Sequence, residues 1–183
     1  MDDVLDRFYQ AAQTLSTDHI VRLTGDCPLA DPDVIDEVIF KHLIEDADYT
    51  SNCCPPTFPD GLDVEIFKYS VLVQSWKNAH LPSHREHVTL FIREKVNNYQ
   101  LANYEGDIDL SHLRWTVDEA EDFDFVTNIY KALYKENYTF KTKDILNLLK
   151  NKPGISLINS KFQRNEGLVK SQKQDNIFLN GEH

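Results

Sequence analysis

Two acidic residues that each follow a short apolar stretch are the first candidates for chemistry. Asp26 comes after the run His19 to Leu23, within the sequence Thr24-Gly25-Asp26-Cys27-Pro28-Leu29. Gly25 permits a tight turn and Pro28 ends a strand, so Asp26 is expected at a strand's carboxyl end, where open α/β sheets bind ligands. A carboxylate there can hold Mg²⁺ against a nucleotide's phosphates. Asp26 could equally serve only to form the turn, because aspartate is common in turns.

A second stretch, Leu113 to Val117, also leads directly to an aspartate, Asp118. Its alternation of apolar and polar residues predicts a strand, and the acidic residues Glu119 to Asp122 predict the start of a helix. The chain is therefore expected to present two strand-end carboxylates.

Composition and charge narrow the class of protein. The 183 residues suit one domain with a sizeable core, and 41% hydrophobic with 27% charged residues is ordinary for a soluble globular chain. A net charge of −11 argues against a nucleic-acid backbone or an anionic membrane as partner. No apolar run approaches the roughly 20 residues of a membrane span, and the first residues are acidic where a signal peptide is basic. We expect a cytoplasmic protein.

The cysteines indicate neither a disulfide framework nor a zinc site. Cys27, Cys53 and Cys54 are odd in number and lack CxxC spacing. Reduced thiols are therefore expected. Cys27 has no obvious base beside it, which favours a buried small residue over a catalytic thiol.

Alternating strand and helix patterns predict an α/β fold with a three-layer, mostly parallel sheet flanked by helices. Asp31-Pro32 supplies an N-cap and an N1 proline for one helix, and Ser83 with Glu86 forms a capping-box pattern for another. Residues 1–154 are expected to form the domain and residues 155–183 a polar, flexible tail. Strands are predicted at 19–23, 48–53, 63–67, 99–104 and 113–117, and helices at 4–15, 32–43, 71–76, 83–92, 119–134 and 142–149.

Six segments in this order resemble the cytidylyltransferases that activate acidic sugars as CMP-sugars, most closely the branch named for spore-coat polysaccharide synthesis. The resemblance runs nearly end to end and implies a fold like that of the nucleotide-diphospho-sugar transferases. The segments are Asp3-Val4-Leu5-Asp6-Arg7, Thr24 to Leu29, Asp60-Gly61-Leu62-Asp63-Val64-Glu65, Arg85-Glu86-His87-Val88-Thr89, Arg114-Trp115-Thr116-Val117-Asp118 and Arg164-Asn165-Glu166-Gly167.

One departure from this family concerns the nucleotide. In the family, a first strand leads into a loop with arginine and lysine that grips CTP, whereas here Met1 is followed directly by a predicted helix. We therefore expect an N-terminally truncated member, with the nucleotide-holding strand and loop missing from this chain or supplied by another polypeptide.

The resemblance assigns roles to one arginine and to two acidic turns. The first turn is Thr24 to Leu29, with Asp26, and the second is Asp118 to Asp122. Asp26 and Asp118 match the positions that bind Mg²⁺, and two carboxylates suit this hard cation. Asp122 is the weaker candidate, because a carboxylate in the first turn of a helix is stabilised by the dipole without any function. Arg85 is expected to grip the sugar's carboxylate through a planar, bidentate contact. An exposed helical arginine paired with a neighbouring glutamate is the equal alternative.

Five further residues are expected to bind substrate. Asp63 and Glu65 alternate on a strand and so face one side, which suits hydroxyl recognition or part of the metal shell. The others are Asn52, His84 and His87, although a lone helical histidine more often serves packing. Arg22 and Arg114 precede the acidic turns and are expected to pair with those carboxylates.

The sequence thus predicts a Mg²⁺-dependent enzyme that transfers CMP from CTP to a sugar acid for surface polysaccharide synthesis. A homodimer through the region from Asp60 to Val88 is expected from the resemblance. The alternative is a truncated, non-catalytic homologue that acts as a dimerisation or interaction module. A glycosyltransferase is disfavoured, because no Asp-x-Asp pair stands at a predicted strand end.

Overall fold

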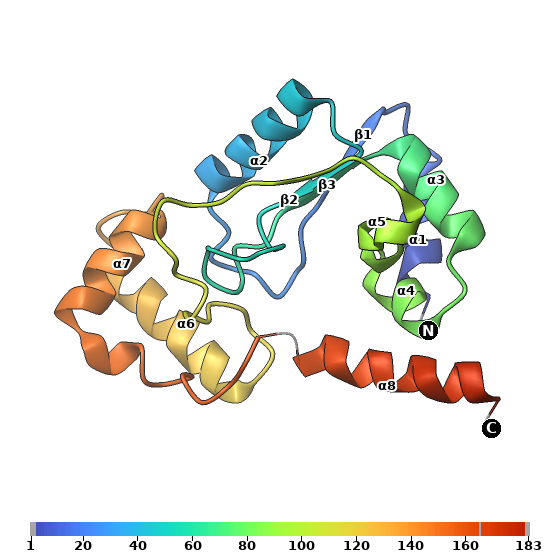
Figure 1. Ribbon diagram of the computed structural model, residues 1–183. Helices are drawn as coiled ribbons and strands as arrows, with labels where there is room; N and C mark the ends of the chain where they lie inside the picture. Colours follow the sequence, from blue (N-terminus) through green and yellow to red (C-terminus); the bar gives the residue numbers. More distant parts are fainter. Residues whose placement is uncertain (1–2, 165, 182–183) are drawn as a thin grey trace.

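The computed structural model describes residues 3–164 and 166–181, and its centre is a four-stranded sheet (Figure 1). The strands lie in the order β1-β3-β2-β4. β3 pairs antiparallel with both β1 and β2, and β2 pairs parallel with β4, so β1, β2 and β4 run in one direction and β3 runs against them. The strands are β1 His19–Arg22, β2 Tyr49–Ser51, β3 Glu65–Lys68 and β4 Leu101–Asn103.

The reversed strand makes the sheet mixed, and its cause lies in the connections. Helix α2 (Pro32–Glu45) carries the chain from β1 to β2, which is the usual parallel crossover. Residues 52–64, between β2 and β3, contain no helix and simply turn the chain back. The expected α/β class is confirmed, while the expected mostly parallel pairing does not hold at β3.

Side-chain alternation along β3 creates the layers. Ile66 packs with Val34 and Val38 of α2 on one face of the sheet. Phe67 points the other way and packs with Leu5 and Leu72, from helices α1 and α3. The helices are α1 Val4–Ala12, α2, α3 Tyr69–Asn78, α4 Pro82–His87, α5 Leu90–Arg93, α6 Ala120–Leu133, α7 Thr142–Asn151 and α8 Glu166–Asn180, with 3-10 turns at Lys95–Asn97 and Pro153–Ile155.

A separate apolar core joins α6 and α7 to the loops beside the sheet (Figure 1). Trp115 is completely buried there together with Leu29, Leu62, Phe125 and Ile129. Since Trp115 and Leu62 come from segments that hold predicted site residues, this core fixes those segments against α6.

Two predicted elements differ in the structure. The segment 113–117 is extended, but it makes only an isolated bridge between Arg114 and Asp60 and is no strand of the sheet. The predicted helix 83–92 is divided into α4 and α5 by Val88, whose φ is +59°. The capping-box prediction is wrong as well: α4 begins at Pro82, and the Ser83 backbone N–H donates to Asp175 at 2.9 Å.

The C-terminal segment, predicted to be a tail, contains α8, which packs against α4. Asn165, part of the closing motif, lies outside the described residues. No helix in the described residues has both the length and the apolar character needed to cross a lipid bilayer.

A buried histidine couples α2 to the sheet. His42 is fully buried, with Nε2 3.0 Å from His19 Nδ1 and Nδ1 2.9 Å from Thr50 Oγ1. Burial, together with the charges of His19 and Lys68, lowers the pKa of His42 to about 4, although Asp46 and Asp48 oppose the shift. His42 is therefore neutral in the folded protein near neutral pH.

This histidine should make stability fall in mild acid. The unfolded chain binds a proton with a pKa near 6.5, so the contribution of neutral His42 is complete above that pH and is lost as the pH falls towards 4. The free energy of unfolding, measured in urea, should drop by about 2 kcal/mol more between pH 7 and 5 in wild type than in His42→Gln. Identical pH dependence in the two proteins would contradict the assignment.

Candidate functional site

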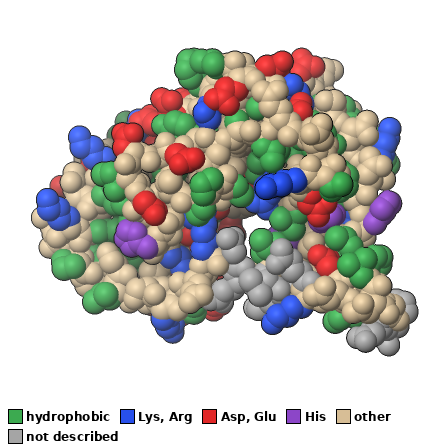
Figure 2. All heavy atoms as spheres, viewed as in Figure 1, with side chains coloured by type: hydrophobic (Ala, Val, Ile, Leu, Met, Phe, Trp, Pro, Cys, Tyr) green, Lys and Arg blue, Asp and Glu red, His purple; other side chains and the backbone are tan. Residues whose placement is uncertain are grey.

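Five of the eight predicted site residues line a cavity of about 760 Å³ between the sheet, the start of α6 and α8, namely Asp26, Asp63, Glu65, His87 and Asp118. Figure 2 shows the surface hollowed on this side of the molecule. The wall is built from five parts of the chain: β1 with the turn 24–27, the loop 53–65, residues 86–93, residues 114–119, and residues 162–164 together with Leu168. Most of its polar lining is charged.

The two acidic turns meet in this wall. The Val117 N–H donates to the Asp26 carbonyl at 2.8 Å, and Thr116 Oγ1 donates to the same oxygen at 3.3 Å. The side chains of Asp26 and Asp118 both line the cavity, and both residues are exposed. In the described part of the chain, the Asp26 carboxylate takes part in no ion pair. The structure therefore brings the two predicted metal ligands to one cavity.

Arg114 holds the second turn in place through Asp122, a completely buried carboxylate. Arg114 Nε and Nη2 donate to the two oxygens of Asp122 at 2.9 and 2.8 Å, and Nη2 also lies 2.8 Å from Asp118. Asp122 further accepts from Asn159 Nδ2 and from the backbone N–H groups of Asp118 and Glu119. Burial raises the pKa of Asp122, but Arg114 and these donors outweigh it and hold the pKa below its ordinary value.

These contacts settle two sequence predictions. Arg114 pairs with the carboxylates around the second turn, as predicted. Asp122 is completely buried and both of its oxygens accept hydrogen bonds from Arg114 and neighbouring donors, which supports a structural role and matches its lower rank as a metal ligand.

Gly61 lets the loop before β3 lie directly against the second turn. Its φ is +104°, and a Cβ atom there would lie 2.5 Å from Thr116 N and 2.6 Å from the Trp115 carbonyl carbon. The neighbouring Asp60 completes the contact, because its N–H donates to Leu113 and its carbonyl accepts from Trp115. Only glycine fits this approach without a shift of backbone.

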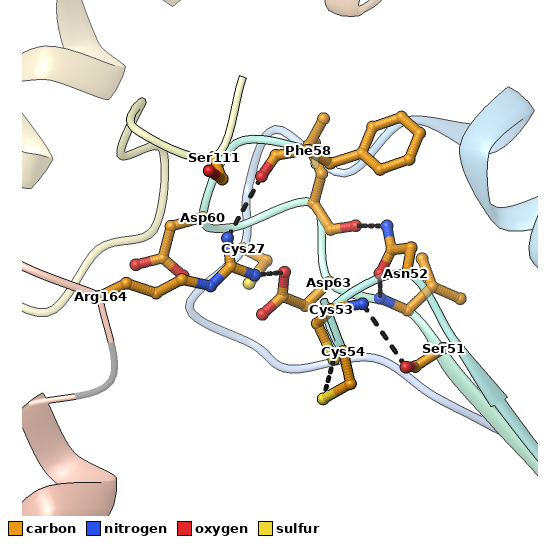
Figure 3. Close-up of polar contacts among 12 residues, drawn as sticks. Cys27, Ser51, Asn52, Cys53, Cys54, Phe58, Asp60, Asp63, Ser111 and Arg164 are labelled. Carbon is orange, nitrogen blue, oxygen red and sulfur yellow. Dashed lines mark hydrogen bonds and ion pairs between the residues drawn. The ribbon is translucent and has the colours of Figure 1, made fainter. Parts of the chain in front are cut away.

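Arg164 crosses the cavity wall to two carboxylates of this loop (Figure 3). It forms an ion pair with Asp63, its Nη1 donates to the Phe58 carbonyl at 3.2 Å, and its Nε lies 3.8 Å from Asp60 Oδ1. Burial and nearby Asp63 raise the pKa of Asp60 to about 6, against the opposing effect of Arg164 and Arg114. Asp63, which is predicted to bind substrate, thus lines the cavity. Its ion pair with Arg164 was not indicated by the sequence pattern.

Glu65 forms the floor of the cavity. It is buried, pairs with Arg22, and accepts hydrogen bonds of 2.6 Å from both Tyr49 Oη and Thr89 Oγ1. Burial alone would raise the pKa of Glu65, but Arg22 and the two hydroxyls lower it. Arg22 therefore pairs with Glu65 rather than with the predicted acidic turn at Asp26.

Among the predicted histidines, only His87 lines this cavity. Its Nε2 lies 2.9 Å from Ser171 Oγ on α8, and burial lowers its pKa. His84 instead contacts Glu94 at 3.0 Å and lines a second cavity of about 540 Å³, beside β4 and α8.

Two predicted substrate residues lie in neither cavity wall. Asn52 is completely buried, where its amide donates to the Leu62 carbonyl at 2.7 Å and accepts from the Val64 N–H at 2.9 Å. It closes the β2–β3 loop. Arg85 binds Asp3 through Nε at 2.8 Å and the Trp76 carbonyl through Nη1 at 2.9 Å. Arg85 thus joins α1, α3 and α4 outside both cavities, and its contact with a sugar stays a prediction.

Sequence reasoning gave no role to two arginines of the cavity, Arg93 and Arg164. Arg93 Nη1 lies 2.8 Å from Cys54 Sγ, and within the described residues Arg93 makes no ion pair. No local pattern marks Arg93. Arg164 stands in the closing motif of the resemblance, which was the available signal for it.

The protein-family model described as Cytidylyltransferase matches residues 1–183. An uncharacterized protein of Methanocaldococcus jannaschii is 35% identical over 164 residues, covering 88% of this chain and 65% of that protein. Spore coat polysaccharide biosynthesis protein SpsF of Bacillus subtilis is 31% identical over 156 residues, covering 82% and 62%.

Among solved structures, a cytidylyltransferase from Leptospira borgpetersenii superposes with a TM-score of 0.79 at 31% identity. The match covers 85% of this chain and 65% of that one. The chain thus spans 62 to 65% of the length of these three relatives.

Asp118 and Asp122 both pair with Arg114, but Asp118 is exposed and Asp122 is buried. Alanine variants of the two can therefore be compared directly. Asp122→Ala leaves Arg114 and two backbone N–H groups without their buried acceptor, and should lower the free energy of unfolding by about 3 kcal/mol or more. Asp118→Ala removes a pair whose carboxylate is 52% exposed and should cost under about 1 kcal/mol. Equal losses in urea unfolding would show that Asp122 does not hold the second turn.

Proposed function

The chain belongs to the cytidylyltransferase family, and we propose that its larger cavity takes part in transferring CMP from CTP to a sugar acid, with Mg²⁺ and with release of pyrophosphate. The observation that carries the proposal is the meeting of the two acidic turns, with Asp26 and Asp118 in one cavity wall. A pair of carboxylates in a cavity wall is the kind of donor set that a nucleotide-bound cation requires.

The relatives support the reaction class and its setting. One solved relative carries the name cytidylyltransferase, and SpsF is named for spore coat polysaccharide biosynthesis. For this chain we propose the corresponding role in surface polysaccharide synthesis. The chain covers 62 to 65% of these relatives, so the proposal concerns what its cavity contributes to such a reaction. A homodimer through residues 60–88 stays a prediction.

The donor set fits Mg²⁺. Magnesium binds through one or two carboxylates and completes its shell with water and substrate phosphate oxygens. In the described residues, no group of three or more histidines, cysteines and acids is arranged to hold a metal by itself. Asp26 and Asp118 would therefore hold the cation together with the nucleotide. When bound, it would neutralise negative charge on the phosphates.

Most of the positive charge in the cavity is already paired with carboxylates, which is why we propose that a cation accompanies the nucleotide. Arg22, Arg114 and Arg164 are each paired with carboxylates of the protein. Arg93 donates to Cys54 Sγ and is the cavity arginine that no carboxylate pairs with in the described part of the chain. A nucleotide with several negative charges needs more positive charge than this arginine offers.

The remaining polar groups would orient the sugar. Phosphoryl transfer of this kind depends on position and charge, because the attacking hydroxyl and the leaving group must lie in line. His87 and Asp63 line the cavity and can bind hydroxyl groups. Glu65, with Arg22, Tyr49 and Thr89 already bound, keeps the floor rigid.

The metal proposal is tested by calorimetric titration of Mg²⁺ into the chain with CTP present. Asp26→Asn removes a charge that the cation needs while the exposed backbone turn is kept, so binding should weaken by about tenfold or more, equal to about 1.4 kcal/mol. Asp124→Asn, an exposed acid on α6 outside the cavity, is the control and should bind like wild type. Equal affinity in wild type and Asp26→Asn would remove Asp26 from the site.

A further inference from the structure

Two adjacent thiols lie where the two cavities meet. Cys53 and Cys54 follow β2 directly, with their Sγ atoms 3.9 Å apart (Figure 3). Both line the larger cavity, and Cys54 lines the second cavity as well. Cys54 is exposed, whereas Cys27 and Cys53 are half-buried. A small molecule in either cavity can therefore reach Cys54.

Arg93 provides the positive charge beside this sulfur. Its Nη1 donates to Cys54 Sγ at 2.8 Å, and Arg93 also lines both cavities. Its Nε is buried and, in the described part of the chain, has no hydrogen-bond partner. A guanidinium next to a thiol favours the thiolate, which is the nucleophilic form.

We propose that Cys54 is a modification site, a thiolate held by Arg93 that exchanges with small disulfides entering the cavities. The Cys54 thiolate attacks one sulfur of the small disulfide, whose S–S bond breaks, and a new S–S bond joins that sulfur to Cys54. The electron pair leaves with the other half as a thiolate. Cys54 is oxidised and half of the small disulfide is reduced, and the proton of Cys54 has already gone to solvent.

Cys53 is not the final partner of Cys54 in this chemistry. Neighbouring Cα atoms lie about 3.8 Å apart across a trans peptide, which is shorter than the range of roughly 4.4 to 6.8 Å that disulfides span. The product is therefore a mixed disulfide with the incoming molecule. Such an adduct stands in the wall between the two cavities and narrows both. The inference rests on the thiols and Arg93 alone, independently of the proposed transfer of CMP.

Cys27 is a matched internal control, because it lines the same larger cavity. The hydrogen bond with Cys53 lowers the pKa of Cys54 to about 6, with the help of Arg93 and against burial. Burial raises the pKa of Cys27. At pH 7 the thiolate form is therefore favoured at Cys54 and the thiol form at Cys27, so Cys54 should react much faster.

The test is the rate of reaction with 5,5′-dithiobis(2-nitrobenzoate), followed by absorbance from pH 5 to 9. Wild type and Cys27→Ser should show one fast thiol with a midpoint near pH 6, and Cys54→Ser should lose that phase while its circular dichroism stays unchanged. A fast phase that survives in Cys54→Ser, or equal rates for all three thiols, would overturn the proposal.

Two variants of Arg93 show whether Cys54 reacts because of the arginine's charge or only because Cys54 is exposed. Arg93→Gln removes the charge and should move the midpoint of the fast phase to higher pH, whereas Arg93→Lys keeps the charge and should restore most of the shift. An unchanged midpoint in Arg93→Gln would show that Cys54 reacts without the arginine and would overturn its assignment.

Discussion

The site depends above all on the contact between Arg114 and the buried carboxylate of Asp122. Arg114 reaches Asp122 at the start of α6, Asp118 in the second acidic turn and Asp60 in the loop before β3. One guanidinium therefore ties the second acidic turn and the start of α6 to the loop before β3, which lies 54 residues earlier in the sequence. A buried charge pair is strongly unfavourable to break, because the partner left behind has no water to replace it. This contact also explains why the segment 113–118 is well positioned although it belongs to no strand of the sheet.

The charge balance of the cavity follows from the same arrangement. Its described lining includes seven carboxylates and four arginines, and three of these arginines are already paired. Such pairs fix the geometry of the wall but leave little positive charge for a ligand. This balance is the basis for the proposal that an anionic substrate binds with a cation, held by the exposed carboxylates of Asp26 and Asp118. The pairs of Arg22, Arg114 and Arg164 thus fix the cavity wall, whereas the Asp26 carboxylate takes part in no ion pair in the described part of the chain.

Local sequence patterns predicted most helices and strands. They could not predict which residues the long arginine side chains contact. Capping residues and apolar spacing indicated α1, α2, α6 and α7. The resemblance assigned Asp26 and Asp118 to one site, although the predicted strand before Asp118 makes only an isolated bridge. The antiparallel β3 was missed because strand direction depends on the length and path of a connection. The contact of Arg85 with Asp3 was missed because helix position does not reveal which carboxylate lies across a helix interface. Arg93 lacked any local signal, since its contact with Cys54 joins residues 39 apart in the sequence.

The central claim is that the cavity between the acidic turns, the loop before β3 and α8 is the nucleotide site. Amide chemical shifts of the ¹⁵N-labelled chain, recorded during titration with CTP and Mg²⁺, test it most directly. The account predicts that the largest changes fall in residues 24–28, 60–65 and 114–119, which surround the cavity. Changes confined to the second cavity, around His84, Leu101 and Asn103, or no changes at all, would contradict it.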